Sequence, residues 1–116
     1  MMVGTNVAAQ YVAKRMPENS VGVELGVWKG DSSAYFAERT RKLHLVDSWS
    51  VEPYKHLDSW EAYLNKYSKI TGGNDVPSFE KYYNSIYQSV VDRFSDNLNI
   101  VIHRKDTDSW FEKFDE

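Results

Sequence analysis

The pattern of apolar and polar positions in the first half of the chain predicts a strand, a loop, a helix and a second strand. Residues 20–25 form a short β-rich stretch that runs into Gly26. A helix is expected over residues 33–39, and residues 42–47 are mostly apolar, as is typical of a buried parallel strand. These elements make one β-loop-α-β unit, whose crossover should be right-handed.

Along the chain, helices are also expected before and after this unit. Residues 59–67 and 78–94 have helical spacing within a long connection, residues 48–97, which we interpret as a helical insertion. Residues 98–103 predict a third strand, and residues 109–114 predict another helix. Before the first strand, apolar residues fall on one face at helical spacing, namely Val7, Ala8, Tyr11, Val12 and Met16.

This order of elements predicts an α/β fold in a single domain over residues 1–116. Two successive crossovers should move outward from the strand that precedes the glycine loop. We therefore expect three parallel strands in the spatial order 3-2-1, with helices on both faces. The length of 116 residues suits one domain and not two.

Composition narrows the class of protein. The net charge is −3 with mixed signs along the chain, so we expect no nucleic acid partner. No apolar run is long enough to suggest a membrane span. Cysteine is absent, which excludes disulfides and thiolate chemistry. With no apolar signal-peptide core at the N-terminus, we expect a cytoplasmic protein.

The segment from Glu24 to Ser32 carries the main chemical signal. Gly26 allows a positive φ and a close approach of a ligand to the backbone, and the following helix offers unpaired N–H groups. Asp47 ends the second strand about 20 residues further on, where a carboxylate can accept two hydrogen bonds from a ribose diol.

The loop differs from the glycine pattern of dinucleotide-binding enzymes, because its only glycines are Gly26 and Gly30. Glu24 precedes the first glycine by two positions and would repel a pyrophosphate. A ligand with an ammonium and a sulfonium group would not be repelled. The charge of this segment therefore favours S-adenosylmethionine over NAD.

Two motifs together resemble the class I, Rossmann-like methyltransferases. The first is Glu24-x-Gly26-x-x-x-Gly30-x-Ser32, and the second is Leu45-Val46-Asp47-Ser48-Trp49. They are most similar to the small-molecule group called methyltransferase domain 24. The similarity extends to residues 79–94 and 104–107, and it implies a three-layer sandwich that binds S-adenosylmethionine and methylates a small molecule.

The resemblance also implies roles for individual residues. Glu24 and Gly26 would lie near the methionyl end and sulfur of the cofactor, and Asp47 would hold the ribose hydroxyls. Asp106 and the backbone of Thr107 would lie at the adenine edge, with Trp49 beside the ring. The remaining expected cofactor-binding residues are Trp28, Gly30 and Ser48.

Each of these residues also has a purely structural interpretation. Gly26 and Gly30 can be turn glycines, and Glu24 can be an exposed strand-end carboxylate. Asp47 can cap the following turn, and Asp106 can cap the next helix. For Trp49, core packing is favoured over a cofactor contact. No residue is assigned as catalytic, and no pair of histidines has metal-ligand spacing.

Aromatic residues make up 15% of the chain, and many lie in the insertion. Trp60, Tyr63 and Tyr67 are spaced i, i+3 and i+7, so they form one helical face. Packing within the insertion is the first interpretation of this face. An aromatic lid over the cofactor is the alternative.

The family's fourth strand, which begins the substrate-binding half, would start where this sequence ends. We therefore expect the chain to represent the cofactor-binding front half and to lack methyl-transfer activity alone. We also expect it to associate with itself through the exposed edge of the first strand, and the alternative is that the insertion of residues 48–97 folds back over that edge. A non-catalytic adenosyl-ligand binder or a protein-interaction module is the alternative function.

Overall fold

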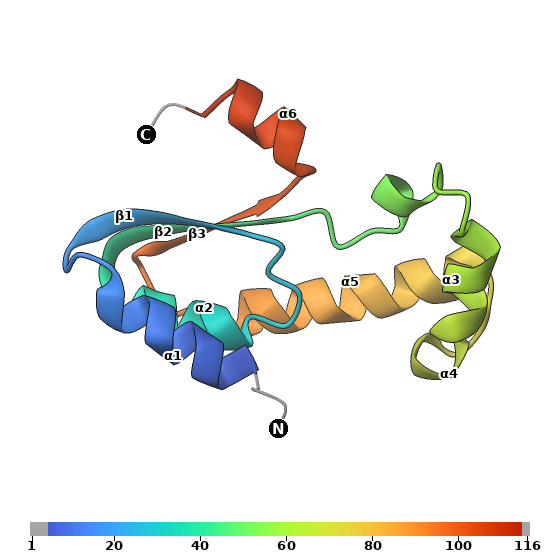
Figure 1. Cartoon of the computed structure of the whole chain (residues 1–116), viewed down its shortest axis with the longest axis horizontal. Coiled ribbons are helices and arrows are strands. Elements are labelled where there is room, and N and C mark those ends of the chain that lie inside the picture. The colour runs from blue at the N-terminus through green and yellow to red at the C-terminus, as the bar shows by residue number, and fades with distance from the viewer. Residues whose placement is uncertain (1–4, 115–116) are drawn as a thin grey trace.

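A computed structural model of the chain describes residues 5–114 and shows a mixed α/β fold (Figure 1). The three strands are β1 (Ser20–Leu25), β2 (Thr40–Asp47) and β3 (Ile100–Arg104). The helices are α1 (Thr5–Arg15), α2 (Asp31–Ala37), the 3-10 turn η1 (Glu52–Tyr54), α3 (Trp60–Lys66), α4 (Ser68–Thr71), α5 (Val76–Arg93) and α6 (Thr107–Glu112).

The strands form one parallel sheet in the order β1-β2-β3. Val23 of β1 lies opposite His44 of β2, which in turn lies opposite Val101 of β3. The expected parallel pairing is therefore confirmed. Because all three strands run the same way, their carboxyl ends meet at one edge, where ligands of open parallel sheets commonly bind.

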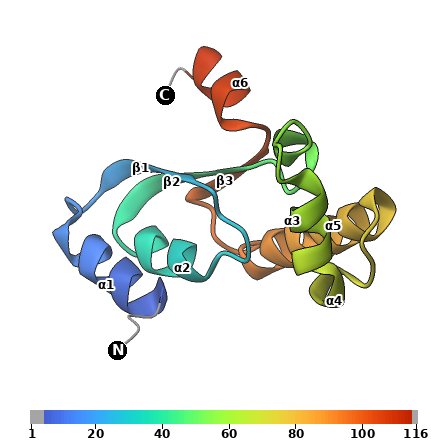
Figure 2. The same cartoon turned by 45° about the vertical axis from the view of Figure 1, so that its right-hand side comes forward.

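Helices cover the two faces of the sheet unequally. Helices α1, α2 and α5 lie on one face, and α6 lies alone on the other (Figures 1 and 2). On the α6 face, Trp110 covers β2 and β3, because its ring packs against both His44 and His103. Val23 and Leu25 of β1 point to this same face but lie beyond α6, and remain 38% and 46% exposed.

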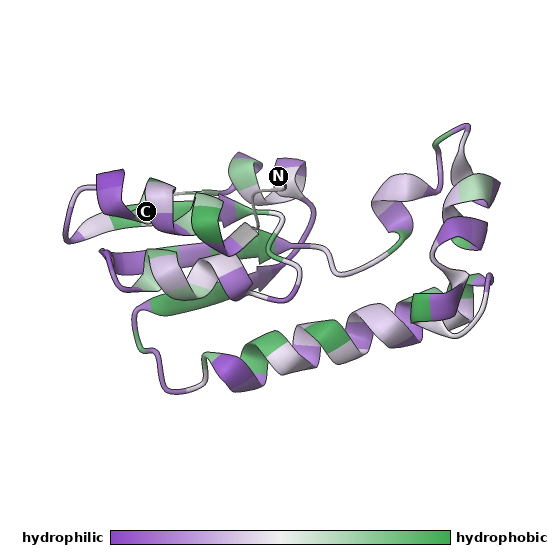
Figure 3. Cartoon of the chain, turned by 60° about the horizontal axis from the view of Figure 1, so that its bottom comes forward, coloured by the Kyte–Doolittle hydropathy of each residue, from purple (hydrophilic) through white to green (hydrophobic). Residues whose placement is uncertain are grey.

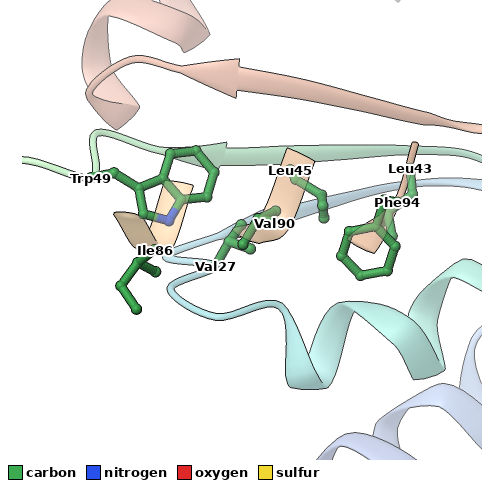
Figure 4. Close-up of a cluster of buried hydrophobic side chains, with 7 residues drawn as sticks. All are labelled: Val27, Leu43, Leu45, Trp49, Ile86, Val90 and Phe94. Atoms are coloured by element: carbon green, nitrogen blue, oxygen red, sulfur yellow. The ribbon is translucent and has the colours of Figure 1, made fainter. Parts of the chain in front are cut away.

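The main core lies between β2 and the face of α5 that is turned toward the sheet (Figure 4). Strand positions alternate, so Leu43 and Leu45 point to this side while their neighbours point to α6. Burial of such aliphatic side chains contributes about 1.5–3 kcal/mol each. The cluster comprises Val27, Leu43, Leu45, Trp49, Ile86, Val90 and Phe94.

The long connection between β2 and β3 has two different parts. The C-terminal half of α5 supplies Ile86 and Val90 to the core and is the crossover helix between the strands. The N-terminal half extends away from the sheet, and α3 and α4 lie against its far end (Figures 1 and 3). Helix α5 alternates hydrophobic and hydrophilic bands along this length, as an amphipathic helix does (Figure 3).

Helix boundaries depart from the sequence expectation where capping decides them. Helix α2 begins at Asp31, because Gly30 adopts a φ of 83° and is itself the N-cap. Helix α5 begins at Val76 because the Asp75 side chain accepts a hydrogen bond from the backbone N–H of Ser78. Asp106 caps α6 in the same way through Ser109, so α6 starts two residues earlier than expected.

The apolar face expected for the N-terminal helix is not its packing face. Val7, Tyr11 and Val12 are 60%, 61% and 49% exposed, whereas Ala9 and Ala13 are buried. Small side chains allow α1 to approach the rest of the fold closely. Within residues 5–114, no helix is both long and apolar enough to cross a membrane.

Candidate functional site

An open cavity of about 310 Å³ lies at the carboxyl ends of the three strands. That volume lies at the lower end of the range of small-molecule sites, which is about 300–1,000 Å³. Five of the residues expected to bind a cofactor line it, together with four that sequence reasoning did not select. The lining residues are Gly26, Val46, Asp47, Ser48, Pro53, Tyr54, Asp106, Thr107 and Asp108.

Asp47 organises this edge of the sheet through backbone hydrogen bonds. Its Oδ2 accepts from the N–H groups of Val27 and Trp28, each at 2.9 Å. Its Oδ1 accepts from the N–H of Trp49 at 2.8 Å. The carboxylate therefore connects the loop after β1 to the loop after β2.

Two tryptophans in these loops have a left-handed backbone, with φ of 54° at Trp28 and 43° at Trp49. This conformation costs a non-glycine residue about 1–2 kcal/mol. The surrounding bonds enforce it, since Asp47 holds both N–H groups and the Trp49 Nε1 donates to the Trp28 carbonyl at 2.8 Å. Backbone strain maintained in this way is a common feature of binding sites.

These contacts limit what Asp47 can offer a ligand. A carboxylate has about four acceptor positions, and three are filled by backbone N–H groups. One position remains, on Oδ1. In this conformation Asp47 can accept one ribose hydroxyl, and not the two that the sequence suggested.

Glu24 is half-buried at the end of β1, and its Oε1 accepts a hydrogen bond from the Ser33 hydroxyl. Burial raises the pKa of Glu24 above its ordinary value, and the nearby Asp47 carboxylate acts in the same direction, while the Ser33 bond opposes both. Ser33 is fully buried and was missed by the sequence analysis, whose first motif ends at the neighbouring Ser32. The helical phase of α2 decides which serine faces inward.

Glycine is favoured at Gly26 and at Gly30 for different physical reasons. At Gly26, with φ of 79°, an added Cβ would meet no atom within 4 Å, so the space beside its backbone is open to a ligand. At Gly30, with φ of 83°, an added Cβ would lie 2.9 Å from Cε2 of Phe94. Gly30 is therefore required by packing of α5 against the loop, and it does not line the cavity.

Asp106 combines a structural and a surface role. Its side chain accepts from the N–H of Ser109 at 2.9 Å and from the Ser109 hydroxyl at 2.8 Å. These bonds lower the pKa of Asp106 below its ordinary value. The capping interpretation is thus correct, and the same carboxylate also lines the cavity beside Thr107 and Asp108.

Four of the expected binding residues, Glu24, Trp28, Gly30 and Trp49, are not among the residues that line this cavity. Trp49 is fully buried beneath the β2 loop, so its indole belongs to the core. Trp28 is 51% exposed and faces a different cavity. Of the residues that sequence reasoning missed, Pro53 and Tyr54 reach the site through η1, whose position no local pattern indicates.

A second cavity of about 520 Å³ adjoins the first and shares Ser48, Pro53, Asp106 and Asp108 with it. Arg104 and Lys105 contribute positive charge there. The Arg104 guanidinium is held by the carbonyls of Ser48 and Trp49, so it is directed at the backbone of the β2 loop. The first cavity is therefore lined by acidic side chains alone among charged groups, whereas the second, which shares Ser48 with it, has both acidic and basic side chains.

The two strand histidines lie on the α6 face and not in the cavity. His44 Nδ1 is 2.9 Å from His103 Nε2, and the rings are stacked. Burial lowers the pKa of His103, and the neighbouring His44, Lys105 and Lys42 act in the same direction. Among residues 5–114, no group of three or more His, Asp or Glu side chains could hold a metal ion.

Comparison with known proteins gives no relative on which to base a function. No protein-family model, no curated protein and no solved structure matches the chain.

The contacts of Asp47 predict a structural effect that needs no ligand. In Asp47→Asn, the amide NH₂ would face at least one backbone N–H group that now donates to the carboxylate. We expect a loss of about 1.5–3 kcal/mol in the free energy of unfolding, the usual value of hydrogen bonds to a charged group. Urea unfolding followed by circular dichroism measures this loss as a lower midpoint.

Asp106→Asn is the matched control, because asparagine caps helices about as well as aspartate. Its midpoint should stay close to that of the unsubstituted chain. Equal losses in the two variants would contradict the connecting role of Asp47.

The environment of Glu24 predicts a pH dependence. A raised pKa in the folded state stabilises the fold below the unfolded-state value of about 4.5, and this contribution is lost as pH rises through the folded-state pKa. Glu24→Gln keeps an acceptor for Ser33 and removes the charge. The variant should be more stable than the original chain at pH 7, with the difference shrinking toward pH 4.5. Unfolding midpoints between pH 4 and 8 measure this.

Glu61→Gln, at an exposed position of α3, controls for the general effect of removing a negative charge. It should not reproduce the gain in stability at pH 7. A Glu24→Gln variant that is less stable at pH 7 and insensitive to pH would show that the charged form is the one that the fold favours.

Proposed function

We propose that the chain binds S-adenosylmethionine at the carboxyl edge of its sheet and forms the cofactor-binding part of a small-molecule methyltransferase. The observation that carries the proposal is the cavity that joins Gly26, Asp47 and Asp106 from three separate loops. Methyl transfer to an acceptor is an in-line displacement at the sulfonium carbon, which mainly requires the two reactants to be positioned.

The residues present fit an adenosyl ligand in three respects. The backbone at Gly26 is open to close approach. Asp47 retains one acceptor position for a ribose hydroxyl. Asp106 and the start of α6 also line the cavity, beside Thr107. When bound, the cofactor would supply the methyl group and the leaving thioether.

Charge distinguishes this ligand from a dinucleotide. The cavity wall carries the carboxylates of Asp47, Asp106 and Asp108 and no lysine or arginine. Glu24 adds a fourth carboxylate behind the loop. These groups disfavour a pyrophosphate and are compatible with a sulfonium and an ammonium.

The fold supports the same proposal. A parallel sheet with helices on both faces, and a glycine loop after β1, is the arrangement of one edge of a Rossmann-like three-layer sandwich. We propose that β1-β2-β3 corresponds to the 3-2-1 half of such a sheet. Fold alone does not determine function, so the cavity remains the main support.

The alternative is a non-catalytic adenosyl-ligand binder or an interaction module. What favours an interaction module is the apolar surface that β1 leaves exposed at Val23 and Leu25. Ligand titration separates the two, since only the binding proposals require an adenosyl compound in the cavity.

The binding proposal predicts that Gly26→Ala weakens ligand affinity. We expect S-adenosylmethionine and S-adenosylhomocysteine to bind the 116-residue chain, and NAD to bind more weakly than either. The added methyl group would occupy space needed by the ligand. Inserting a methylene into filled space costs about 1–3 kcal/mol, or roughly 5- to 150-fold in affinity. Isothermal titration calorimetry gives each dissociation constant.

Gly72→Ala is a matched control for this test. Gly72 also has a positive φ, 91°, and an added Cβ would also meet nothing within 4 Å, but it does not line the cavity. Both variants carry the same backbone strain, and only Gly26→Ala should lose affinity. Tighter binding of NAD, or no adenosyl binding by a folded chain, would reject the proposal.

We also propose that a second copy of the chain covers the outer edge of β1. Among the described residues β1 pairs only with β2, so its other edge has backbone groups available for pairing. The light-scattering mass of the titration samples should exceed 13.5 kDa at micromolar concentration. A monomer would show that this edge needs no partner.

A further inference from the structure

A third cavity, open to solvent and here called the aromatic cavity, lies between Trp28 of the glycine loop and the helical segment after β2. Its volume is about 430 Å³, within the usual range for a small-molecule site. Seven of its nine lining residues are aromatic and none is charged. They are Trp28, Tyr54, Tyr63, Tyr67, Ile70, Thr71, Phe79, Tyr82 and Tyr83.

Tyr63 organises the aromatic cavity. Its ring is stacked on Tyr54, with centroids 5.1 Å apart and an interplanar angle of 19°. It also contacts Phe79 of α5 at 5.6 Å. Its hydroxyl is hydrogen-bonded to the hydroxyl of Tyr83, so α3 and α5 are joined by a polar pair inside an apolar wall.

Two hydroxyl groups of the aromatic cavity, those of Tyr54 and Tyr83, are held in the protonated form. Burial raises the pKa of Tyr54 and of Tyr83 above their ordinary value, and nearby Tyr63 and Asp47 act in the same direction. One hydroxyl of the Tyr63–Tyr83 pair donates to the other, which leaves one O–H free to donate. The cavity therefore offers flat ring surfaces and a neutral polar group.

Two lysine ammonium groups already lie over aromatic rings of this cavity. The Lys29 ammonium lies 4.6 Å from the Trp28 ring centroid, and the Lys66 ammonium lies 5.3 Å from that of Tyr67. These charges would repel a cationic ligand, although an aromatic cage alone could attract one. A neutral ligand meets no such penalty, and ring–ring contacts favour it.

We propose that the aromatic cavity binds a neutral, planar aromatic molecule that carries a hydroxyl group. Tyr54 lines both this cavity and the one at Gly26, so both ligands would lie beside one residue. Binding of the aromatic molecule does not depend on the adenosyl ligand, and either can be detected when the other is absent.

The test uses 2-naphthol as the probe, with the ¹⁵N-labelled 116-residue chain followed by NMR. Saturable shifts should appear at the Trp28 indole N–H and at backbone amides of α3 and of the first half of α5. Decahydro-2-naphthol has the same skeleton and hydroxyl without aromatic rings, and should bind more weakly. Tetramethylammonium, a probe for an aromatic cation cage, should cause no saturable shifts at these sites.

Trp28→Gly removes one ring and is expected to fold. Glycine accepts the positive φ of 54°, and the N–H to Asp47 and the carbonyl that accepts from Trp49 are retained. Affinity for 2-naphthol should fall about two- to tenfold, the usual value of a ring–ring contact. Phe111→Ala is the control, because Phe111 is also 51% exposed but lies on α6, outside the cavity.

Shifts confined to the aromatic cavity, and weakened in Trp28→Gly alone, would establish the site. Equal affinity for the saturated analogue would overturn the requirement for an aromatic ligand. Tighter binding of tetramethylammonium would overturn the requirement for a neutral one. An absence of saturable shifts in the original chain would show that the rings only pack helices together.

Discussion

The carboxylate of Asp47 is the constraint on which this end of the molecule depends. It accepts hydrogen bonds from three backbone N–H groups in two loops, which α2 and β2 separate along the chain. Two tryptophans are thereby held with a left-handed backbone, and the indole of one bonds to the carbonyl of the other. The shape of the cavity beside Gly26 follows from this arrangement, because Gly26 immediately precedes the residues that Asp47 holds.

Negative charge at the same edge of the sheet lowers the stability of the fold. Glu24 is half-buried beside Asp47, and its raised pKa indicates that folding penalises its ionised form. Asp106 avoids this cost because it is exposed and satisfied by its cap to Ser109. Strain and unfavourable charge gathered at one edge of a sheet are typical of a binding site, where stability is exchanged for an arrangement of groups that suits a ligand.

The second main structural feature of the molecule is the helical segment between β2 and β3. The C-terminal half of α5 completes the core with Val90, and Phe94 follows directly after the helix. The N-terminal half of α5 extends beyond the sheet and carries α3 and α4. Aromatic rings fill the junction, and Tyr54 lies between the two cavities. A ligand in either cavity would meet this side chain, so the two spaces are joined physically although their chemistry differs.

The local sequence pattern determined which helices and strands this protein forms, and the order in which its candidate site residues occur along the chain. The periodicity of residues 78–94 was sufficient for α5, and the apolar run ending at Asp47 was sufficient for β2, because each element has its own repeat. Parallel pairing then followed, since helical crossovers separate the strands. Local pattern selected Gly26 and Asp47, and the resemblance to methyltransferases added Ser48, Asp106 and Thr107. All five lie at or just after the ends of strands and therefore meet at one edge.

Tertiary structure decided which way side chains point and what they contact. Ser33 rather than Ser32 meets Glu24 because of the phase of α2, and Ala9 and Ala13 pack because α1 turns its larger apolar residues outward. The partners of the Asp47 carboxylate, and the arrival of Tyr54 beside it, depend on how η1 and two loops are placed in space. Contacts between residues far apart in the chain leave no periodic signal, so only the folded structure determines them.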